Sequence, residues 1–242
     1  MDSKKLIVFL FGTCLIWSCQ PLLIKLISKK SVLGQVKTLS HQNQESTIVF
    51  MPVIHVGKAT YYNSFQPIVD SLRDQGFQIY VESIAYQEEL SEVDKLMYNK
   101  KFRKFTGYHT THAVVNESLP EEFKMKNYML KDYAMMGINK SKGDDILDLP
   151  KNKLIDKYES EFGEIKLNEC DRNTPLNDKY SCDSAYKKLL HLLTNQYRDE
   201  YIVQQLLQKK EKKVVLIYGK QHWYSIYPEL LKAGYSLIQG KI

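Results

Sequence analysis

The stretch KKVVLIYGKQHWYSIYPELLKAGY, from Lys212 to Tyr235, decides the fold of this chain. Its run VVLI has aliphatic residues at consecutive positions, which is typical of a strand covered on both faces in a parallel sheet. A helix is expected next, with Ser225 as N-cap, Pro228 in the first turn and Gly234 at the C-terminal end. His222 then lies between a strand and a helix, where open α/β sheets bind their ligands.

The same pattern occurs earlier, in TIVFMPVIHVGKATYYNSFQPIVDSLRDQGFQIYVESI, from Thr47 to Ile84. An apolar run leads to His55, a helical pattern follows, and a second apolar run ends at Glu82. This order predicts a βαβ unit. If the three runs are parallel neighbours, His55, Glu82 and His222 emerge at the same edge of the sheet, and this convergence is the main functional signal of the sequence.

A chain of 242 residues with 43% hydrophobic content can bury a full core, and we expect a single domain over residues 34–242. Residues 34–40 are predicted to pair as a hairpin with the run to His55, which makes the sheet mixed. The predicted fold is therefore α/β, with a mixed, mainly parallel central sheet flanked by helices and a mostly helical middle insertion. The net charge of +6 is spread along the chain, which argues against nucleic-acid binding.

The first residues have the parts of a secretory signal, because Lys4 and Lys5 precede an apolar stretch that leads into Cys19. Residues 1–18 are interpreted as a lipoprotein signal peptide, Cys19 as the lipidated residue and 19–33 as a tether. The alternative is an uncleaved membrane anchor, since apolar residues continue past Cys19. Either interpretation places the body of the protein outside the cytoplasm, on the periplasmic or outer-membrane side of a bacterial cell envelope.

Residues 85–165 are expected to form a helical insertion that covers the strand ends as a lid. The spacing of apolar residues predicts a helix over 87–105, closed by Gly107, and a second one over 123–136. The stretch KSKGDDILD, residues 140–148, is expected to be a polar turn.

Two groups of polar residues in this insertion are predicted to have no special role. His109 and His112 lie in a polar segment without the glutamate of a metalloprotease helix, so they are expected at the surface. Asp144, Asp145 and Asp148 lack the spacing of a calcium loop and are expected to be solvated.

Cys170 and Cys182 bracket the polar loop DRNTPLNDKYS. Outside the cytoplasm, two such cysteines are expected to form a disulfide, which would stabilise the fold by about 3 kcal/mol.

Residues 185–208 are the longest helix candidate, and Arg198 borders the apolar face of this helix. Arg198 could reach the strand ends and hold an anion or a carboxylate through two hydrogen bonds. A surface pair with Asp199 or Glu200 is the alternative, and spacing alone favours it.

His55, Glu82 and His222 together offer two imidazoles and one carboxylate, the ligand set of many catalytic zinc sites. A metal held there would lower the pKa of a bound water and supply hydroxide near neutral pH. In a metal-free alternative, Glu82 acts as general base and a histidine as acid or oxyanion partner. A third interpretation is that each histidine only satisfies a buried turn.

The segments MPVIHVG, VES, YRDEY and YGKQHW, in this order, resemble the TraB, PrgY, GumN and Tiki group of the wider EreA/ChaN-like superfamily. These proteins carry two glycine-x-x-histidine motifs, a glutamate that ends an early strand and an arginine on the helix before the last motif. The second motif is intact here as residues 219–222, and Glu82 and Arg198 fall at the expected places. Pro52 stands where the first motif has glycine, although His55 is retained.

This resemblance implies an α/β core with its site at the strand ends. Tiki members are metal-dependent, membrane-tethered proteases that use manganese or cobalt, EreA-like relatives hydrolyse an ester through histidine and glutamate, and ChaN-like lipoproteins bind haem. We therefore expect an extracytoplasmic hydrolase of peptides or small molecules, with Mn, Co or Zn as its metal. Glu82, His222 and Arg198 would be catalytic, with His55, Glu82 and His222 as metal ligands.

Two further functions remain open from the sequence. One is a lipoprotein that binds a ligand such as haem without catalysis. The other is a regulatory member of the same fold that has lost turnover, and Pro52 is the residue that suggests it.

Overall fold

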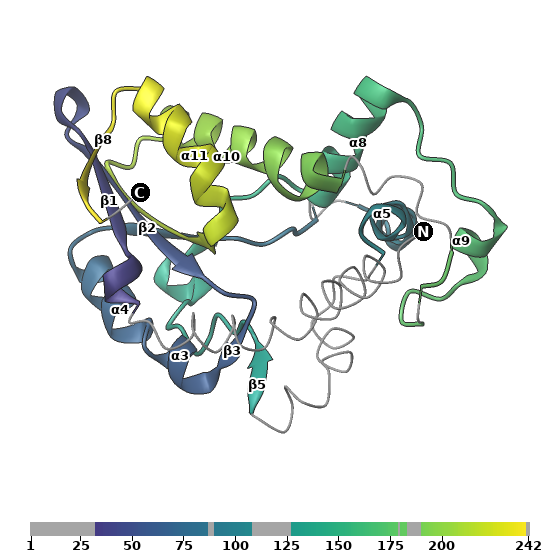
Figure 1. Ribbon diagram of the computed structural model, residues 1–242, viewed down its shortest axis with the longest axis horizontal. Coiled ribbons are helices and arrows are strands. Elements are labelled where there is room, and N and C mark those ends of the chain that lie inside the picture. Colours follow the sequence, from purple (N-terminus) through teal and green to yellow (C-terminus); the bar gives the residue numbers. More distant parts are fainter. Residues whose placement is uncertain (1–31, 87–89, 108–126, 179, 183–189, 241–242) are drawn as a thin grey trace, which may run out of the picture.

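A computed structural model describes residues 32–86, 90–107, 127–178, 180–182 and 190–240 of the chain. Its centre is a six-stranded sheet with the order β6-β4-β7-β2-β1-β8 (Figure 1). The strands are β1 (Lys37–His41), β2 (Ser46–Val53), β4 (Gln78–Val81), β6 (Asp145–Ile146), β7 (Lys213–Gly219) and β8 (Ser236–Gln239). Strands β6, β4, β7 and β2 run parallel, and β1 is antiparallel to both β2 and β8. The predicted mixed, mainly parallel α/β sheet is confirmed.

A second, two-stranded antiparallel sheet joins β3 (Val56–Lys58) to β5 (Tyr128–Leu130). The α-helices are α3 (Ala59–Asn63), α4 (Gln66–Asp74), α5 (Glu92–Thr106), α8 (Lys151–Phe162), α9 (Glu169–Asn173), α10 (Tyr197–Gln208) and α11 (Lys220–Lys232). Shorter elements are the 3-10 turns η1 (Leu33–Gln35), η2 (Gln42–Gln44) and η3 (Lys140–Lys142), and the π-helical turn η5 (Leu192–Gln196).

Helices cover both faces of the main sheet, which explains why its central strands are aliphatic at consecutive positions (Figure 1). Along β7, Leu216 packs in the core shared with α10 and α11, whereas Val215 and Ile217 pack in the core shared with α3 and α4. The same alternation places Phe50 and Met51 of β2 on opposite faces. The central strands are therefore buried on both sides, and their carboxyl ends lie at one edge of the sheet.

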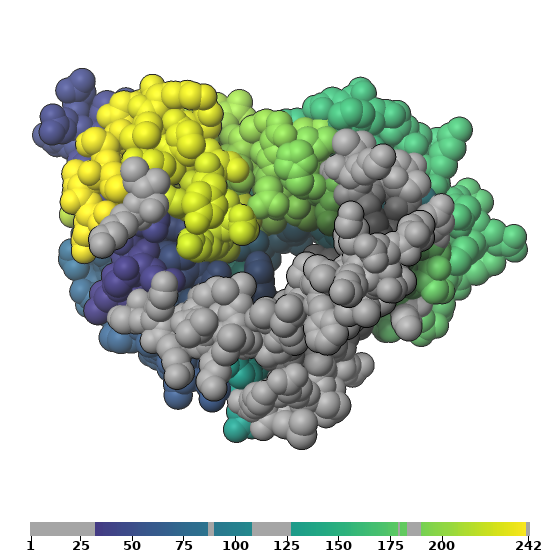
Figure 2. Space-filling model, viewed as in Figure 1, coloured from purple at the N-terminus to yellow at the C-terminus, as the bar shows by residue number. Residues whose placement is uncertain are grey.

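A third core lies beside the sheet, where α5 and α8 pack on η5 and the start of α10. Ser91 caps α5 by accepting a hydrogen bond from the N–H of Asp94, and Gly107 ends it in the left-handed conformation. The predicted helix over 87–105 is thus confirmed from Glu92 onward. Figure 2 shows the C-terminal elements and the α8–α9 region at opposite ends of the molecule.

The predicted disulfide between Cys170 and Cys182 is present and holds the loop that follows α9. Among the residues that the structure describes, no helix is both long enough and apolar enough to cross a bilayer.

The middle of the chain differs from the expectation. Residues 127–136 of the predicted helix 123–136 form β5 and a turn, because Asn127 adopts a left-handed conformation that breaks a helix. The expected polar turn 140–148 contains β6, which pairs in parallel with β4. The range 85–165 therefore adds an edge strand to the main sheet as well as its helices.

The start of α11 also differs. Gly219 is extended and acts as N-cap, so the helix begins at Lys220 rather than at Ser225. Pro228 consequently lies inside the helix, and His222 lies in its first turn instead of in a loop.

Candidate functional site

The carboxyl ends of the neighbouring strands β2, β4 and β7 carry the three residues singled out from the sequence. Glu82 follows β4 directly, and its N–H donates to the carbonyl of Ile217 at 3.2 Å. Nε2 of His55, just after β2, lies 3.9 Å from Oε1 of Glu82. Nε2 of His222 lies 3.3 Å from the same oxygen. The structure thus brings both imidazoles to one carboxylate.

The backbone of Gly219 lies against the side chains of this cluster. Its N–H donates to Oε2 of Glu82 at 2.8 Å. A Cβ atom at this position would lie 3.3 Å from Oε2 of Glu82 and 3.5 Å from Nε2 of His55. The strand end needs glycine here because the carboxylate and the imidazole approach the backbone so closely.

Pro52 lies three residues before His55, as Gly219 lies three before His222, but in the sheet it pairs with Tyr218 of β7, one residue before Gly219. The pairing with β1 stops at Phe50, so in the described residues Pro52 lies beyond the reach of that neighbouring strand. A missing N–H costs little at such a position. The carbonyl of Pro52 accepts a hydrogen bond from Tyr61 at 3.4 Å, and His55 still reaches the cluster.

Arg198, at the start of α10, is buried and binds two carboxylates. Its Nε and Nη2 donate to Asp148 at 2.9 and 2.6 Å, and Nη2 also donates to Oε1 of Glu82 at 3.1 Å. Nη1 donates to the carbonyl of Thr194 in η5 at 2.8 Å. The surface pairing of Arg198 with Asp199 or Glu200, which spacing alone favoured, is wrong, because the side chain points into the sheet edge.

Asp148 and Asp144 are buried rather than solvated, which corrects a second expectation. Asp148 follows β6 and reaches the same edge as Glu82. Asp144 is paired away from this edge, with Arg73 at 2.6 Å. Each carboxylate tolerates burial because a guanidinium lies against it.

His222 is buried between two carboxylates. Its Nδ1 bonds to Oδ1 of Asp199, and its Nε2 faces Glu82. Burial by itself lowers the pKa of His222, but the hydrogen bonds with Asp199 and Glu82 outweigh burial and raise it to about 9. At neutral pH this histidine is an imidazolium.

Glu82 is also buried, yet its pKa is held well below the ordinary value. Burial opposes ionisation, but the hydrogen bond with His222 and the positive charges of Lys131 and Arg198 outweigh it. Nζ of Lys131 lies 3.6 Å from Oε2, and burial lowers the pKa of this lysine. Tyr133 donates its hydroxyl hydrogen to the carbonyl of Glu82.

His55 is the exposed member of the cluster, with 64% of its side chain accessible. The side chains of Glu82, Arg198 and His222 are 7%, 4% and 4% accessible. A molecule arriving from solvent therefore meets His55 first.

The described residues contain no group of three or more metal-ligating side chains arranged to hold an ion. The chemistry of the donors agrees. Both oxygens of Glu82 accept hydrogen bonds, from Arg198 and from the N–H of Gly219, and the positive charges of Lys131 and Arg198 lie beside them. A metal ion bound here would have to displace the proton of His222 and meet these charges. The predicted Mn, Co or Zn site stays a prediction.

The sequence analysis did not place four residues of the cluster at the site: Lys131, Tyr133, Asp148 and Asp199. Asp148 obeys the same rule as Glu82, since it follows a parallel strand, but a strand of two residues gives no periodicity to detect. Lys131 and Tyr133 follow β5, whose pairing with β3 brings them beside His55. Their place depends on a distant pairing that no local pattern reveals.

The predicted histidines His109 and His112 and the predicted lipidation residue Cys19 lie outside the described residues. No known protein family, curated protein or solved structure matches this chain significantly.

Proposed function

We propose that the protein is a hydrolase that activates water with His55 and Glu82, at the carboxyl edge of its sheet. The observation that carries this proposal is the pairing of an exposed imidazole with a buried, ionised carboxylate, at 3.9 Å between Nε2 and Oε1. Burial and the nearby cations Lys131, Arg198 and His222 lower the pKa of His55, which keeps the ring neutral and able to accept a proton, while Glu82 favours the charge that the ring then gains.

The roles differ from those expected from the sequence. Glu82 is a poor general base because its pKa is strongly depressed, whereas His55 is open to solvent and can accept a proton from water. Glu82 then balances the charge that appears on His55. His222, as an imidazolium, and Arg198 keep Glu82 ionised and in place.

The substrate class in this proposal is an ester or a peptide bond, because activated water attacks either carbonyl. The location is the extracytoplasmic side of a membrane, with Cys19 as the lipidated tether. The disulfide between Cys170 and Cys182 supports an oxidising compartment.

The proposal is tested by measuring how the purified protein hydrolyses libraries of esters and peptides. One series of assays contains a chelator, and the other contains added manganese, cobalt or zinc. We expect hydrolysis that survives the chelator and falls by about 10²-fold or more in His55→Ala. His191→Ala is the matched control, because His191 is an exposed histidine outside the cluster.

Three results would change the conclusion. Turnover that appears only with added metal would return the site to the metal-dependent mechanism. Equal activity of His55→Ala and His191→Ala would remove His55 from the reaction. Absence of hydrolysis with every substrate, together with haem absorbance after addition of haem, would favour the binding lipoprotein.

A further inference from the structure

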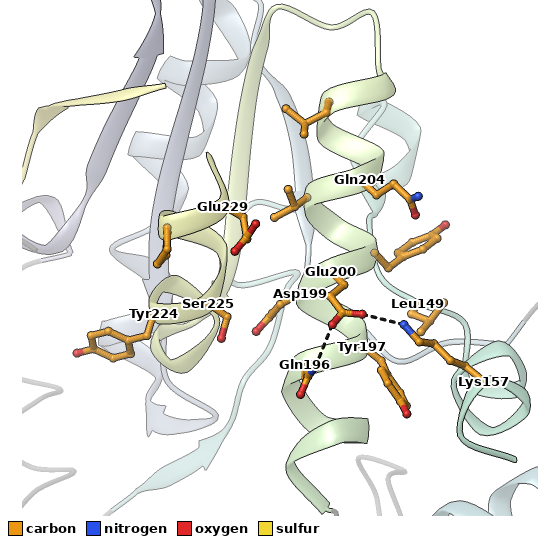
Figure 3. A pocket seen from close by; sticks show the side chains of 14 residues that line it. Leu149, Lys157, Gln196, Tyr197, Asp199, Glu200, Gln204, Tyr224, Ser225 and Glu229 are labelled. Atoms are coloured by element: carbon orange, nitrogen blue, oxygen red, sulfur yellow. Dashed lines mark hydrogen bonds and ion pairs between the residues drawn. The ribbon is translucent and has the colours of Figure 1, made fainter. Parts of the chain in front are cut away.

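A pocket of about 950 Å³ lies between α10 and α11, beside the cluster, and the α8 residue Lys157 reaches its rim (Figure 3). This volume is in the range of small-molecule sites. Asp199 connects the pocket to the cluster, because Oδ1 bonds to His222 while the side chain also lines the pocket.

The second oxygen of Asp199 has no hydrogen-bond partner among the described residues, although the residue is only 3% exposed. A buried carboxylate oxygen without a donor is costly, because the oxygen has lost its hydrogen bonds to water without gaining others. Native proteins rarely leave such a group unsatisfied, and each case calls for an explanation. A ligand that donates a hydrogen bond inside the pocket explains this one.

The charge of the pocket indicates what that ligand is. Its carboxylates are those of Asp199, Glu200 and Glu229, and its lysine, Lys157, is already bound to Glu200 at 2.8 Å. Glu229 pairs with Lys232 at 2.7 Å, but both side chains are at least half exposed, so this pair is weak and easily exchanged. By formal charge the lining carries three carboxylates against one lysine, and the imidazolium of His222 lies against Oδ1 of Asp199, so Oδ2 of Asp199 and the exposed Glu229 are the acceptors left for a ligand.

The geometry agrees with a cationic occupant. In Figure 3 the side chains of Asp199 and Glu229 extend from α10 and α11 into the space between the two helices. Pro228, inside α11, lines the same space. The remaining wall includes Val203 and Leu207, which suit the apolar stem of a long cationic side chain.

We infer that this pocket binds an organic cation with an apolar stem, of the kind carried by an arginine side chain, through the free oxygen of Asp199 and the carboxylate of Glu229. A guanidinium would satisfy the orphaned oxygen with a charge-assisted hydrogen bond. The site shares Asp199 with the cluster, but neither His55 nor Glu82 lines it, so the test of binding does not require hydrolytic activity.

Calorimetric titration of the full chain with a matched pair of ligands tests this inference. Nα-acetyl-arginine amide carries the guanidinium, and Nα-acetyl-citrulline amide replaces it with a neutral urea of nearly the same shape. We expect the arginine ligand to bind at least about tenfold more tightly, because only it brings charge to a buried acceptor.

Two variants locate the binding. Glu229→Gln is expected to weaken binding of the arginine ligand several-fold, and Asp199→Asn to remove the preference for arginine over citrulline. Glu92→Gln is the control, since Glu92 is an exposed, lysine-paired glutamate on α5. If Asp199→Asn fails to fold, Glu229→Gln and the ligand pair still decide. Equal affinity for the two ligands, no binding of either, or arginine binding unchanged by Glu229→Gln would overturn the inference.

Discussion

One ring nitrogen of His222 bonds to Asp199 and the other faces Glu82, and these two contacts determine the charge of the ring. An imidazole between two buried carboxylates is more stable protonated, even though burial alone would favour the neutral ring. The residue therefore supplies a fixed positive charge rather than a group that exchanges protons at neutral pH. This is why the proposed base is His55, which solvent can reach.

The raised pKa of His222 predicts how stability depends on pH. The folded-state value of about 9 exceeds the ordinary value of 6.5, so the stabilisation is complete below about pH 6.5 and is lost as pH rises through about 9. Urea unfolding at intervals across this range should show a falling free energy of unfolding. His222→Gln should flatten the profile, and His191→Gln should not. Parallel profiles for the wild type and His222→Gln would contradict the assigned charge.

Glu82 gives the opposite dependence, at acid pH. Its folded pKa is depressed, so its stabilising effect is present above the ordinary value of 4.5 and is lost as pH falls through the folded value. The two residues together confine the greatest stability of the cluster to the range between about pH 4.5 and pH 6.5.

At the scale of elements, α10 is joined to the sheet edge by Arg198. This residue links the helix to Asp148 after β6 and to Glu82 after β4. Both carboxylates are buried, so their charges depend on the guanidinium.

Removal of this link is expected to destabilise the fold strongly. Arg198→Ala leaves the buried Asp148 without its cation and removes one of the cations around Glu82, and it should lower the free energy of unfolding by about 3–5 kcal/mol. Arg73→Ala is the matched control, because Arg73 also binds a buried aspartate, Asp144, but is itself 17% exposed, so water can replace part of the interaction. Urea unfolding of both variants measures the difference. A loss for Arg198→Ala that is no larger than that for Arg73→Ala would show that the link is weak.

Strands and helices could be predicted where the sequence carries a long local pattern of apolar residues. The runs that form β2, β4 and β7 are buried on one or both faces and stand out by their aliphatic residues, so their parallel order and the shared edge followed. The strands β5 and β6 have three and two residues and depend on partners elsewhere in the chain. The start of α11 was misplaced because Gly219 ends the strand and caps the helix in a single residue.

At the scale of the whole molecule, the disulfide secures the end opposite to β8. The loop between Cys170 and Cys182 also contacts α5, where Arg103 donates to the carbonyl of Pro175 at 2.6 Å and Lys104 binds Asp171. These contacts attach the loop to the helix α5 of the third core.

Loss of the disulfide is expected to lower the free energy of unfolding by about 3 kcal/mol, because the unfolded chain regains the freedom of the closed loop. The double variant Cys170→Ser with Cys182→Ser tests this by urea unfolding. Reductant should bring the wild type down to the stability of the variant and leave the variant unchanged. Equal stability of the two oxidised proteins would mean that the contacts with α5 suffice.

The order of the strands along the chain determines when the partners of Glu82 appear during synthesis. The arginine and the backbone N–H that hold Glu82 come 116 and 137 residues after it. A growing chain that ends before Arg198 carries Glu82 without either partner, and one that ends between Arg198 and Gly219 still lacks the backbone N–H. The cluster around Glu82 is therefore completed only when the C-terminal segment has left the ribosome.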